Sequence, residues 1–324
     1  MLPGFRSNEA KSFIAGGLRD FSISRATQTW GIPVPWDPEQ VAYVWADALV
    51  NYLSALTYAP GADLRFWPAR HLLAKDILRF HCVYWPALLL AAGYEVPKQL
   101  FVHGYLNLDD RKISKSLGNV LDPLDLIDEY GVDPVRFWAA RVVPFGQDGN
   151  VTLDSFRDRY ESELGNDLGN LLSRTTAMIA RYRDGALPEA PDDQSELAAA
   201  AKTLHEDVPA ALDHFDITGA LETIWDYVRG LNRYVEQTKP WELAKDPARE
   251  GDLDRALFEL ADGLRIAAVA LSPYLPETAS SILAALGQST DVAWEHVAYG
   301  RTAPASGIEA AQPLFPRIDA PTPA

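Results

Sequence analysis

The stretch from Phe101 to Asn119 constrains this chain more than any other, because it joins a strand pattern to a short cationic loop. Aromatic and β-branched residues at its start favour a β-strand. After a polar segment, Lys112 and Lys115 stand three residues apart among small hydroxyl residues. An ammonium group on a flexible stem suits phosphate groups whose charge grows during a reaction. We predict a phosphate-contacting loop, and an ordinary solvated turn is the alternative that this segment alone leaves open.

Length and composition narrow the class of protein. A chain of 324 residues has room for about two domains. Its net charge of −16 argues against a nucleic-acid-binding surface over the whole molecule, so any RNA contact needs local clusters of Arg and Lys. The single cysteine, Cys82, excludes a disulfide and a cysteine-cluster zinc site within the chain, and we expect no metal site. The longest apolar run, residues 85–93, is too short for a membrane span, and we expect a cytoplasmic protein.

The first hundred residues mix strand and helix patterns. We predict a short helix over residues 8–14 that ends at Gly16 and Gly17. Alternation predicts a strand over residues 20–25, and a buried strand is predicted over residues 41–45. An apolar helix is predicted to begin at residue 77. This mixture indicates an α/β fold.

Several motifs resemble the methionyl-tRNA synthetase family of class I aminoacyl-tRNA synthetases. They are S-I-S-R, W-G-I-P-V-P, Y-V-W-A-D-A-L-V-N-Y, the F-H pair, and K-I-S-K-S, which is similar to the family signature K-M-S-K-S. The resemblance implies a methionine pocket, and a soft thioether packs well on aromatic rings. The implied pocket residues are Trp45, Tyr52, Phe80 and His81. Taken singly, Trp45, Tyr52 and His81 fit a side chain of the core better than a binding residue, and the neighbouring motifs favour the pocket.

The same resemblance implies an ATP site. The string H-L-L-A-K-D is similar to a family motif whose Asp, here Asp76, holds the ATP ribose at the end of a strand. His103 matches F-V-H-G-Y near the adenylate, and Lys112 and Lys115 match the signature lysines, with Lys115 expected to stabilise the leaving pyrophosphate. ATP with Mg²⁺ is expected as a substrate. Ala74 departs from the usual Gly, and its methyl group adds bulk close to the expected adenosine site.

Residues beyond about 150 change to long helical patterns. Apolar stripes at helical spacing cover residues 153–182, 217–235, 253–271 and 276–287, and residues 188–196 are predicted to form an acidic loop. Short connections between amphipathic helices predict a helix bundle. Two motifs, N-L-L-S-R and N-R-Y-V-E-Q-T-K-P-W, resemble the anticodon-binding domain of the family and imply that Asn170, Arg174 and Trp241 contact tRNA. A solvated helix face and a helix-packing Trp are the alternatives.

Together these features predict a partial Rossmann-like class I catalytic domain, of α/β type, followed by an all-α anticodon-binding bundle. The predicted boundaries are 1–118 for the second half of the catalytic domain, 119–152 for a connecting module and 153–324 for the bundle. The family motif H-x-G-H and the zinc-bearing insertion are not found in the sequence. We therefore expect the C-terminal portion of a synthetase, partnered by a missing N-terminal half, with weak or absent ATP–pyrophosphate exchange by this chain alone.

The expected function is methionine–tRNA ligase, with methionine, ATP and tRNA(Met) as partners and with no membrane contact. Two alternatives remain open. One is a non-catalytic tRNA-binding or regulatory relative, which needs the bundle but not the loop that carries Lys112 and Lys115, called here the lysine loop. The other is a class I synthetase for another apolar amino acid, such as leucine or valine, against which the four pocket residues argue.

Overall fold

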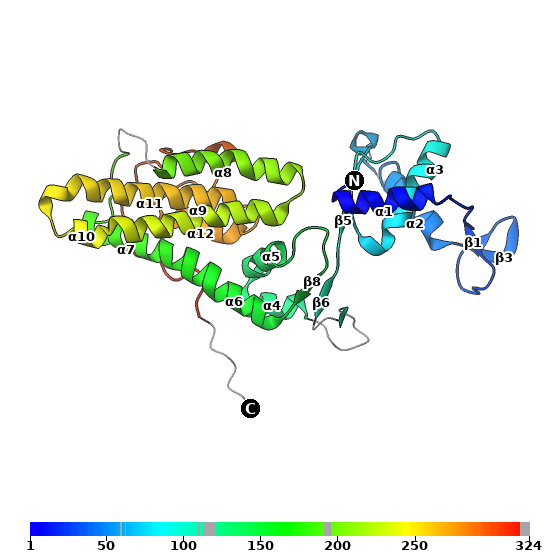
Figure 1. The fold of residues 1–324 in the computed structure, drawn as a ribbon, viewed down its shortest axis with the longest axis horizontal. Helices are drawn as coiled ribbons and strands as arrows, with labels where there is room; N and C mark the ends of the chain where they lie inside the picture. Colours follow the sequence, from blue (N-terminus) through cyan, green and yellow to red (C-terminus); the bar gives the residue numbers. More distant parts are fainter. Residues whose placement is uncertain (59, 62, 109–110, 113–120, 191–195, 318–324) are drawn as a thin grey trace, which may run out of the picture. The chain divides into compact units, whose positions relative to one another are not determined.

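A computed structural model of the chain describes residues 1–58, 60–61, 63–108, 111–112, 121–190 and 196–317 (Figure 1). The chain divides into two compact units. Unit 1 contains residues 1–105 and 145–148, and unit 2 contains residues 106–144 and 149–324. Among the described residues, helices and strands both occur in each unit, so the fold is of mixed α/β type.

Unit 1 combines short strands with helices. Its helices are α1 (Gly4–Ala15), α2 (Val44–Ser54), a π-helix (Phe80–Tyr84), α3 (Trp85–Ala91), and the 3₁₀ turns Leu64–Phe66 and Lys75–Ile77. Its strands are β1 (Ser24–Arg25), β2 (Pro33–Val34), β3 (Asp37–Ala42), β4 (Arg70–Ala74) and β5 (Gln99–His103). The first three strands form an antiparallel sheet in the order β1-β3-β2, and β4 pairs with β5 in parallel.

The parallel pair β4–β5 organises the core of unit 1. Side chains alternate along β4, so that His71 and Leu73 are buried while Arg70 and Leu72 are exposed. Leu73 packs with residues of α1, β5 and the π-helix, including Val102, in one small apolar core. Parallel pairing brings the carboxyl ends of both strands to the same edge, where polar residues of the sequence motifs are expected.

Two of the predicted elements in unit 1 differ from the observed ones. The helix predicted over residues 8–14 is confirmed as the longer α1, and the strand ending near Asp76 is confirmed as β4. The strand predicted over residues 41–45 is wrong at its end, because β3 stops at Ala42 and α2 begins at Val44. The strand predicted over residues 20–25 is reduced to its last two residues, which are the ones that pair with β3.

Unit 2 is mainly helical. Its helices are α4 (Pro123–Tyr130), α5 (Val132–Arg141), α6 (Leu153–Arg159), a π-helix (Tyr160–Gly169), α7 (Asn170–Arg183), α8 (Glu196–Asp213), α9 (Ile217–Thr238), α10 (Pro240–Leu243), α11 (Glu250–Leu271), α12 (Pro276–Ala285), and the 3₁₀ turns Pro247–Arg249 and Trp294–His296. Its strands are β6 (Leu106–Leu108), β7 (Arg111–Lys112) and β8 (Gly149–Val151). Within the described residues after 152, every regular element is a helix.

Helix α11 forms the centre of unit 2. It packs against α7, α8, α9 and α12 (Figure 1). Its residues from Ala256 to Leu271 are all buried. The stripes predicted over residues 217–235, 253–271 and 276–287 are confirmed as α9, α11 and α12. Polar groups also join the helices, since the Asp133 carboxylate on α5 accepts a hydrogen bond from the Thr278 backbone N–H at the start of α12 (2.7 Å).

Two short strands, β6 and β7, lie just before and at the start of the lysine loop. Strand β6 pairs with β7 in antiparallel register, with Asn107 opposite Lys112, and pairs with β8 in parallel. The backbone of Lys112 thus belongs to β7. Lys115 lies outside the described residues.

Candidate functional site

Seven rings from four neighbouring elements and one turn of unit 1 gather into one group, called here the aromatic cluster. The rings come from α2, the turn before β4, β4 itself, the π-helix and α3. They make a continuous series of ring contacts, in which Trp45 links the Phe80 ring to His81 and so to the others. The cluster consists of Trp45, Tyr52, Trp67, His71, Phe80, His81 and Trp85.

One wall of the cluster is a stacked pair. Trp45 and Phe80 lie with their ring centroids 4.6 Å apart and their planes only 10° from parallel. Both rings are partly buried against the small core formed by Leu49, Trp85 and Leu89. A stacked pair that is half open offers a flat, polarizable surface, which suits an apolar or sulfur-containing group.

A hydrogen-bonded pair gives the cluster its polar end. The Nδ1 atom of His81 lies 3.1 Å from the Ile77 carbonyl oxygen, which can only accept, so Nδ1 carries a proton. Burial lowers the pKa of His81, which keeps the ring neutral near pH 7. Nε2 is then an acceptor, and the Tyr52 hydroxyl donates to it over 2.9 Å. The direction of this hydrogen bond follows from the backbone carbonyl one helical turn away.

The local backbone brings the predicted residues Phe80 and His81 to the cluster. Both lie in the π-helix Phe80–Tyr84, whose wider turn shifts side chains relative to a regular α-helix. Such single π turns occur often at functional sites. The structure therefore brings together all four residues that the motifs predicted for the pocket, and adds Trp67, His71 and Trp85.

His71 is a member of the cluster that the sequence motifs did not assign to the pocket. Its side chain is only 5% exposed, and its Nε2 atom has no hydrogen-bond partner among the described residues. Its ring lies edge-on to Tyr52, with the centroids 4.3 Å apart. Burial, and then the charge of nearby His81, lower the pKa of His71 to about 4. In the sequence, His71 is the first residue of the H-L-L-A-K-D string, which was assigned to the ATP site and not to this pocket.

The lowered pKa of His71 predicts a loss of stability in mild acid. Above pH 6.5, His71 is neutral in both the folded and the unfolded chain. As the pH falls from about 6.5 to about 4, His71 binds a proton in the unfolded chain but not in the folded chain. The free energy of unfolding therefore falls by up to about 3 kcal/mol. Urea unfolding of the wild type and of His71→Gln at a series of pH values measures this. The difference in unfolding free energy should shrink as the pH falls, and a pH-independent difference contradicts the prediction.

Of the residues predicted to contact ATP, Asp76 and His103 lie at the carboxyl ends of β4 and β5, whereas Lys115 is outside the described residues. Asp76 is exposed in the turn that follows β4, and His103 is exposed as the last residue of β5. Ala74, which replaces the usual Gly, is opposite His103 in the register. The Nδ1–H of His103 donates to the Gly104 carbonyl (2.8 Å), so its Nε2 atom is available as an acceptor.

The residues predicted to contact RNA come from two helices of unit 2, with Asn170 and Arg174 on α7 and Trp241 on α10. Asn170 is exposed and donates to the Asn166 side chain (3.3 Å). Arg174 forms an ion pair with Glu236 on α9 (2.7 Å), and its guanidinium carbon lies 5.7 Å from the ring centroid of Trp241. Trp241 is partly buried and packs against the core of unit 2. The Arg174–Trp241 contact joins the two predicted motifs.

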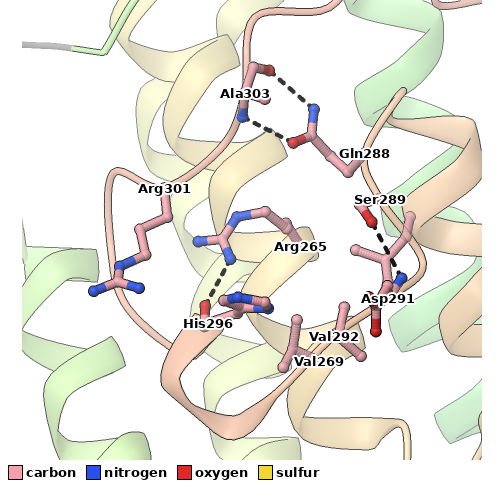
Figure 2. Close-up of a pocket in the computed structure, with 10 residues that line it drawn as sticks. Arg265, Val269, Gln288, Ser289, Asp291, Val292, His296, Arg301 and Ala303 are labelled. Atoms are coloured by element: carbon pink, nitrogen blue, oxygen red, sulfur yellow. Dashed lines mark hydrogen bonds between the residues drawn. The ribbon is translucent and has the colours of Figure 1, made fainter.

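A separate pocket of about 440 Å³ lies in the C-terminal part of unit 2 (Figure 2). Arg265 extends along it and donates to the carbonyl oxygens of His296 and Ala298 (both 2.7 Å). The same guanidinium pairs with Asp262, and both side chains are at least 95% buried. These contacts attach the segment after α12 to α11, so Arg265 and Asp262 have a structural role.

Within the described ranges, no three His, Cys, Asp or Glu side chains gather in a way that could hold a metal ion. In the same part of the chain, no helix combines the length and the apolar character required to cross a membrane.

Comparison with a known family defines the class of this protein. The sequence model of the family described as tRNA synthetases class I (M) matches residues 4–176, which is more than half of the chain. The chain belongs to this family of class I tRNA synthetases.

Individual relatives narrow the class further. The chain is 44% identical over 326 aligned positions to the methionine–tRNA ligase of Caldanaerobacter subterraneus, and 42% identical over 330 positions to that of Bacillus subtilis. Each alignment covers 98% of this chain, and the chain spans about half the length of these relatives. The structure is similar to that of Mycobacterium tuberculosis methionyl-tRNA synthetase in complex with methionyl-adenylate, with a TM-score of 0.89 at 39% identity, over 97% of this chain and 64% of that chain.

Proposed function

We propose that this chain carries part of the active site, and the tRNA-binding bundle, of a methionine–tRNA ligase. Family membership and relatives named methionine–tRNA ligase support the reaction class. The observation that carries the proposal is the aromatic cluster, in which the Trp45–Phe80 stack and the Tyr52–His81 hydrogen bond involve all four residues that the motifs predicted.

The cluster has the chemistry of a methionine pocket. The methionine side chain is unbranched and ends in a polarizable thioether, which gains contact energy on aromatic rings. The flat wall formed by Trp45 and Phe80 matches this shape, whereas the branched side chains of leucine and valine fit a flat wall less well. The Tyr52 hydroxyl donates its only hydrogen to His81, so it presents an acceptor oxygen to a bound ligand. Methionine is therefore the proposed amino acid substrate.

The proposed first step joins methionine to ATP. The methionine carboxylate attacks the α-phosphate, and pyrophosphate leaves with the electron pair of the broken P–O bond. Asp76 is proposed to hold the ribose, His103 to contact the adenosine part, and Lys112 and Lys115 to stabilise the leaving pyrophosphate, whose charge Mg²⁺ shares. Since no covalent bond to the protein is required, positioning and electrostatic stabilisation supply the catalysis.

The proposed second step transfers the methionyl group to tRNA(Met). Asn170, Arg174 and Trp241 are proposed to contact the anticodon, where Trp241 offers a ring face and the other two offer hydrogen-bonding groups. We propose residues 1–118 as the catalytic part, 119–152 as a connecting module and 153–324 as the anticodon-binding part. Because aminoacyl-tRNA serves translation, the cytoplasm is the proposed location, and a segment equivalent to the rest of the relatives is a proposed partner of this chain.

Removal of the stacked wall tests the proposed function. Trp45→Ala should lower the affinity of the purified chain for methionine by about tenfold or more, because a desolvated aromatic contact is worth about 1.5–3 kcal/mol. Isothermal titration with methionine, leucine and valine measures the effect. Thermal melting with each amino acid provides a second reading, and only methionine should raise the melting temperature of the wild type.

Trp36→Ala is the matched control. Trp36 belongs to the same unit and is 80% exposed, and it is not part of the aromatic cluster. This variant should bind methionine as the wild type does. A wild-type chain that is stabilised equally by leucine, or a Trp45→Ala variant with unchanged affinity, contradicts the proposed methionine pocket.

A further inference from the structure

A carboxylate outside every sequence motif lies at the edge where the nucleotide residues stand. The parallel register of β4 and β5 puts Ala74 opposite His103, so Lys75 and Tyr105 follow side by side at the carboxyl ends of the two strands. The Lys75 ammonium lies 4.7 Å from the centroid of the Tyr105 ring. Asp148, 73 residues beyond Lys75, reaches both of these residues.

Both carboxylate oxygens of Asp148 are used. Oδ2 forms an ion pair with the Lys75 ammonium, and Oδ1 accepts a hydrogen bond from the Tyr105 backbone N–H over 2.9 Å. The hydrogen bond from Lys75, and then the one from the Tyr105 N–H, lower the pKa of Asp148. A single side chain therefore ties the residue before Asp76 to the backbone just after His103.

The short segment that carries Asp148 is itself held in place. Arg6 on α1 donates to the Gly146 carbonyl (3.3 Å). A methyl group on Gly104 would lie 2.1 Å from the Gln147 carbonyl oxygen, so the two backbones touch. Gly146 has a φ of 87°, and a side chain there would also meet Pro3. Asp148 thus reaches the ends of β4 and β5 from a fixed backbone position.

We propose that Asp148 is a positioning residue for the adenosine part of the reaction intermediate. The inference rests on the proposed function, because it assumes that Asp76 and His103 contact ATP. By holding Lys75 and the Tyr105 backbone, Asp148 keeps the two contact residues at a fixed separation before the nucleotide binds. The pair is partly exposed, with the Lys75 and Asp148 side chains 26% and 39% accessible, so its contribution to overall stability is small. A positioning role and a purely structural role are therefore separable.

The test uses a protein in which this chain is extended to the length of its relatives, and it compares the affinities for two ligands. One ligand is methionine, and the other is a non-hydrolysable methionyl-adenylate analogue, which adds the adenosine part and binds tightly because it resembles the intermediate. In Asp148→Ala, the affinity for the analogue should fall about tenfold, while the affinity for methionine should stay within about twofold. In Asp148→Asn, the amide oxygen still accepts from the Tyr105 N–H, and the loss for the analogue should be only about threefold.

Glu39→Gln is the matched control. It removes one negative charge from an exposed position of the same unit, and Glu39 has no ion pair or side-chain hydrogen bond among the described residues. It should leave both affinities unchanged. An equal loss for both ligands in Asp148→Ala, or no loss for either, overturns the inference and leaves the proposed function intact. If the extended wild-type protein binds methionine and the analogue with equal affinity, the proposed nucleotide site is overturned, and this inference with it.

Discussion

Lys115→Ala should lower the rate of methionyl-adenylate formation by about 10²- to 10³-fold. The expected effect is that of removing one preorganised cation from a group that gains negative charge in the transition state. ATP–pyrophosphate exchange measures it, in a protein in which this chain is extended to the length of its relatives. The affinity for methionine should change little, because the proposed methionine pocket lies in unit 1 and depends on other side chains.

Lys98→Ala is the matched control for this prediction. Lys98 is an exposed lysine just before β5, and it donates to the Ala69 carbonyl (2.9 Å) through its backbone N–H. It should exchange pyrophosphate at the wild-type rate. Undiminished exchange by Lys115→Ala shows that the loop does not stabilise the leaving group, and the proposed chemistry then lacks its main cation.

Asp262→Ala should destabilise the protein by about 3–5 kcal/mol. Its carboxylate is fully buried and accepts from Arg265 (2.7 and 3.0 Å), the Gly300 N–H (2.7 Å) and the Thr302 hydroxyl (2.5 Å). The variant leaves a buried guanidinium without its counter-charge, which costs far more than a surface pair. Urea unfolding followed by the circular dichroism of the helices measures the change.

Asp252→Ala serves as the comparison, because Asp252 lies on the same helix and pairs with Arg249 at the surface. It should change the unfolding free energy by less than about 1 kcal/mol. Asp262→Leu combined with Arg265→Met should recover part of the loss, since both charges are then removed together. If the single variant Asp262→Ala is as stable as Asp252→Ala, the buried Asp262–Arg265 pair does not hold the segment after α12 in place.

The helices of unit 2 were predictable where the apolar spacing is regular. Stripes such as that of α9, with Leu221, Ile224, Val228 and Leu231 all fully buried, repeat at intervals of three and four residues. Helix α8 was not predicted, because its run of four alanines offers little contrast between an apolar and a polar face, and because a proline such as Pro209 is unfavourable inside a helix. The two π-helices have no signal in the apolar spacing and depend on how the chain is packed.

The ends of the short strands of unit 1 were not predictable from the sequence. Residues 41–45 have the composition of a strand, yet only the first two remain in β3, where they pair with β1 and β2. Strand β3 instead begins at Asp37 and includes Pro38, which strand propensity disfavours. Pairing with neighbours decides the ends of such short strands more than the residues themselves do.

The sequence by itself determined the family and the helical faces of unit 2, because motifs and apolar stripes depend on residue types at local spacing. It also predicted that Trp45, Tyr52, Phe80 and His81 share a pocket, and the role of this pocket is a proposal. Only the tertiary structure decided that His71 joins these rings, that Tyr52 donates to His81, and that Asp148 holds Lys75. These three facts depend on contacts between residues distant along the chain. Their partners are set by the route of the backbone through the fold, which residue spacing alone does not encode.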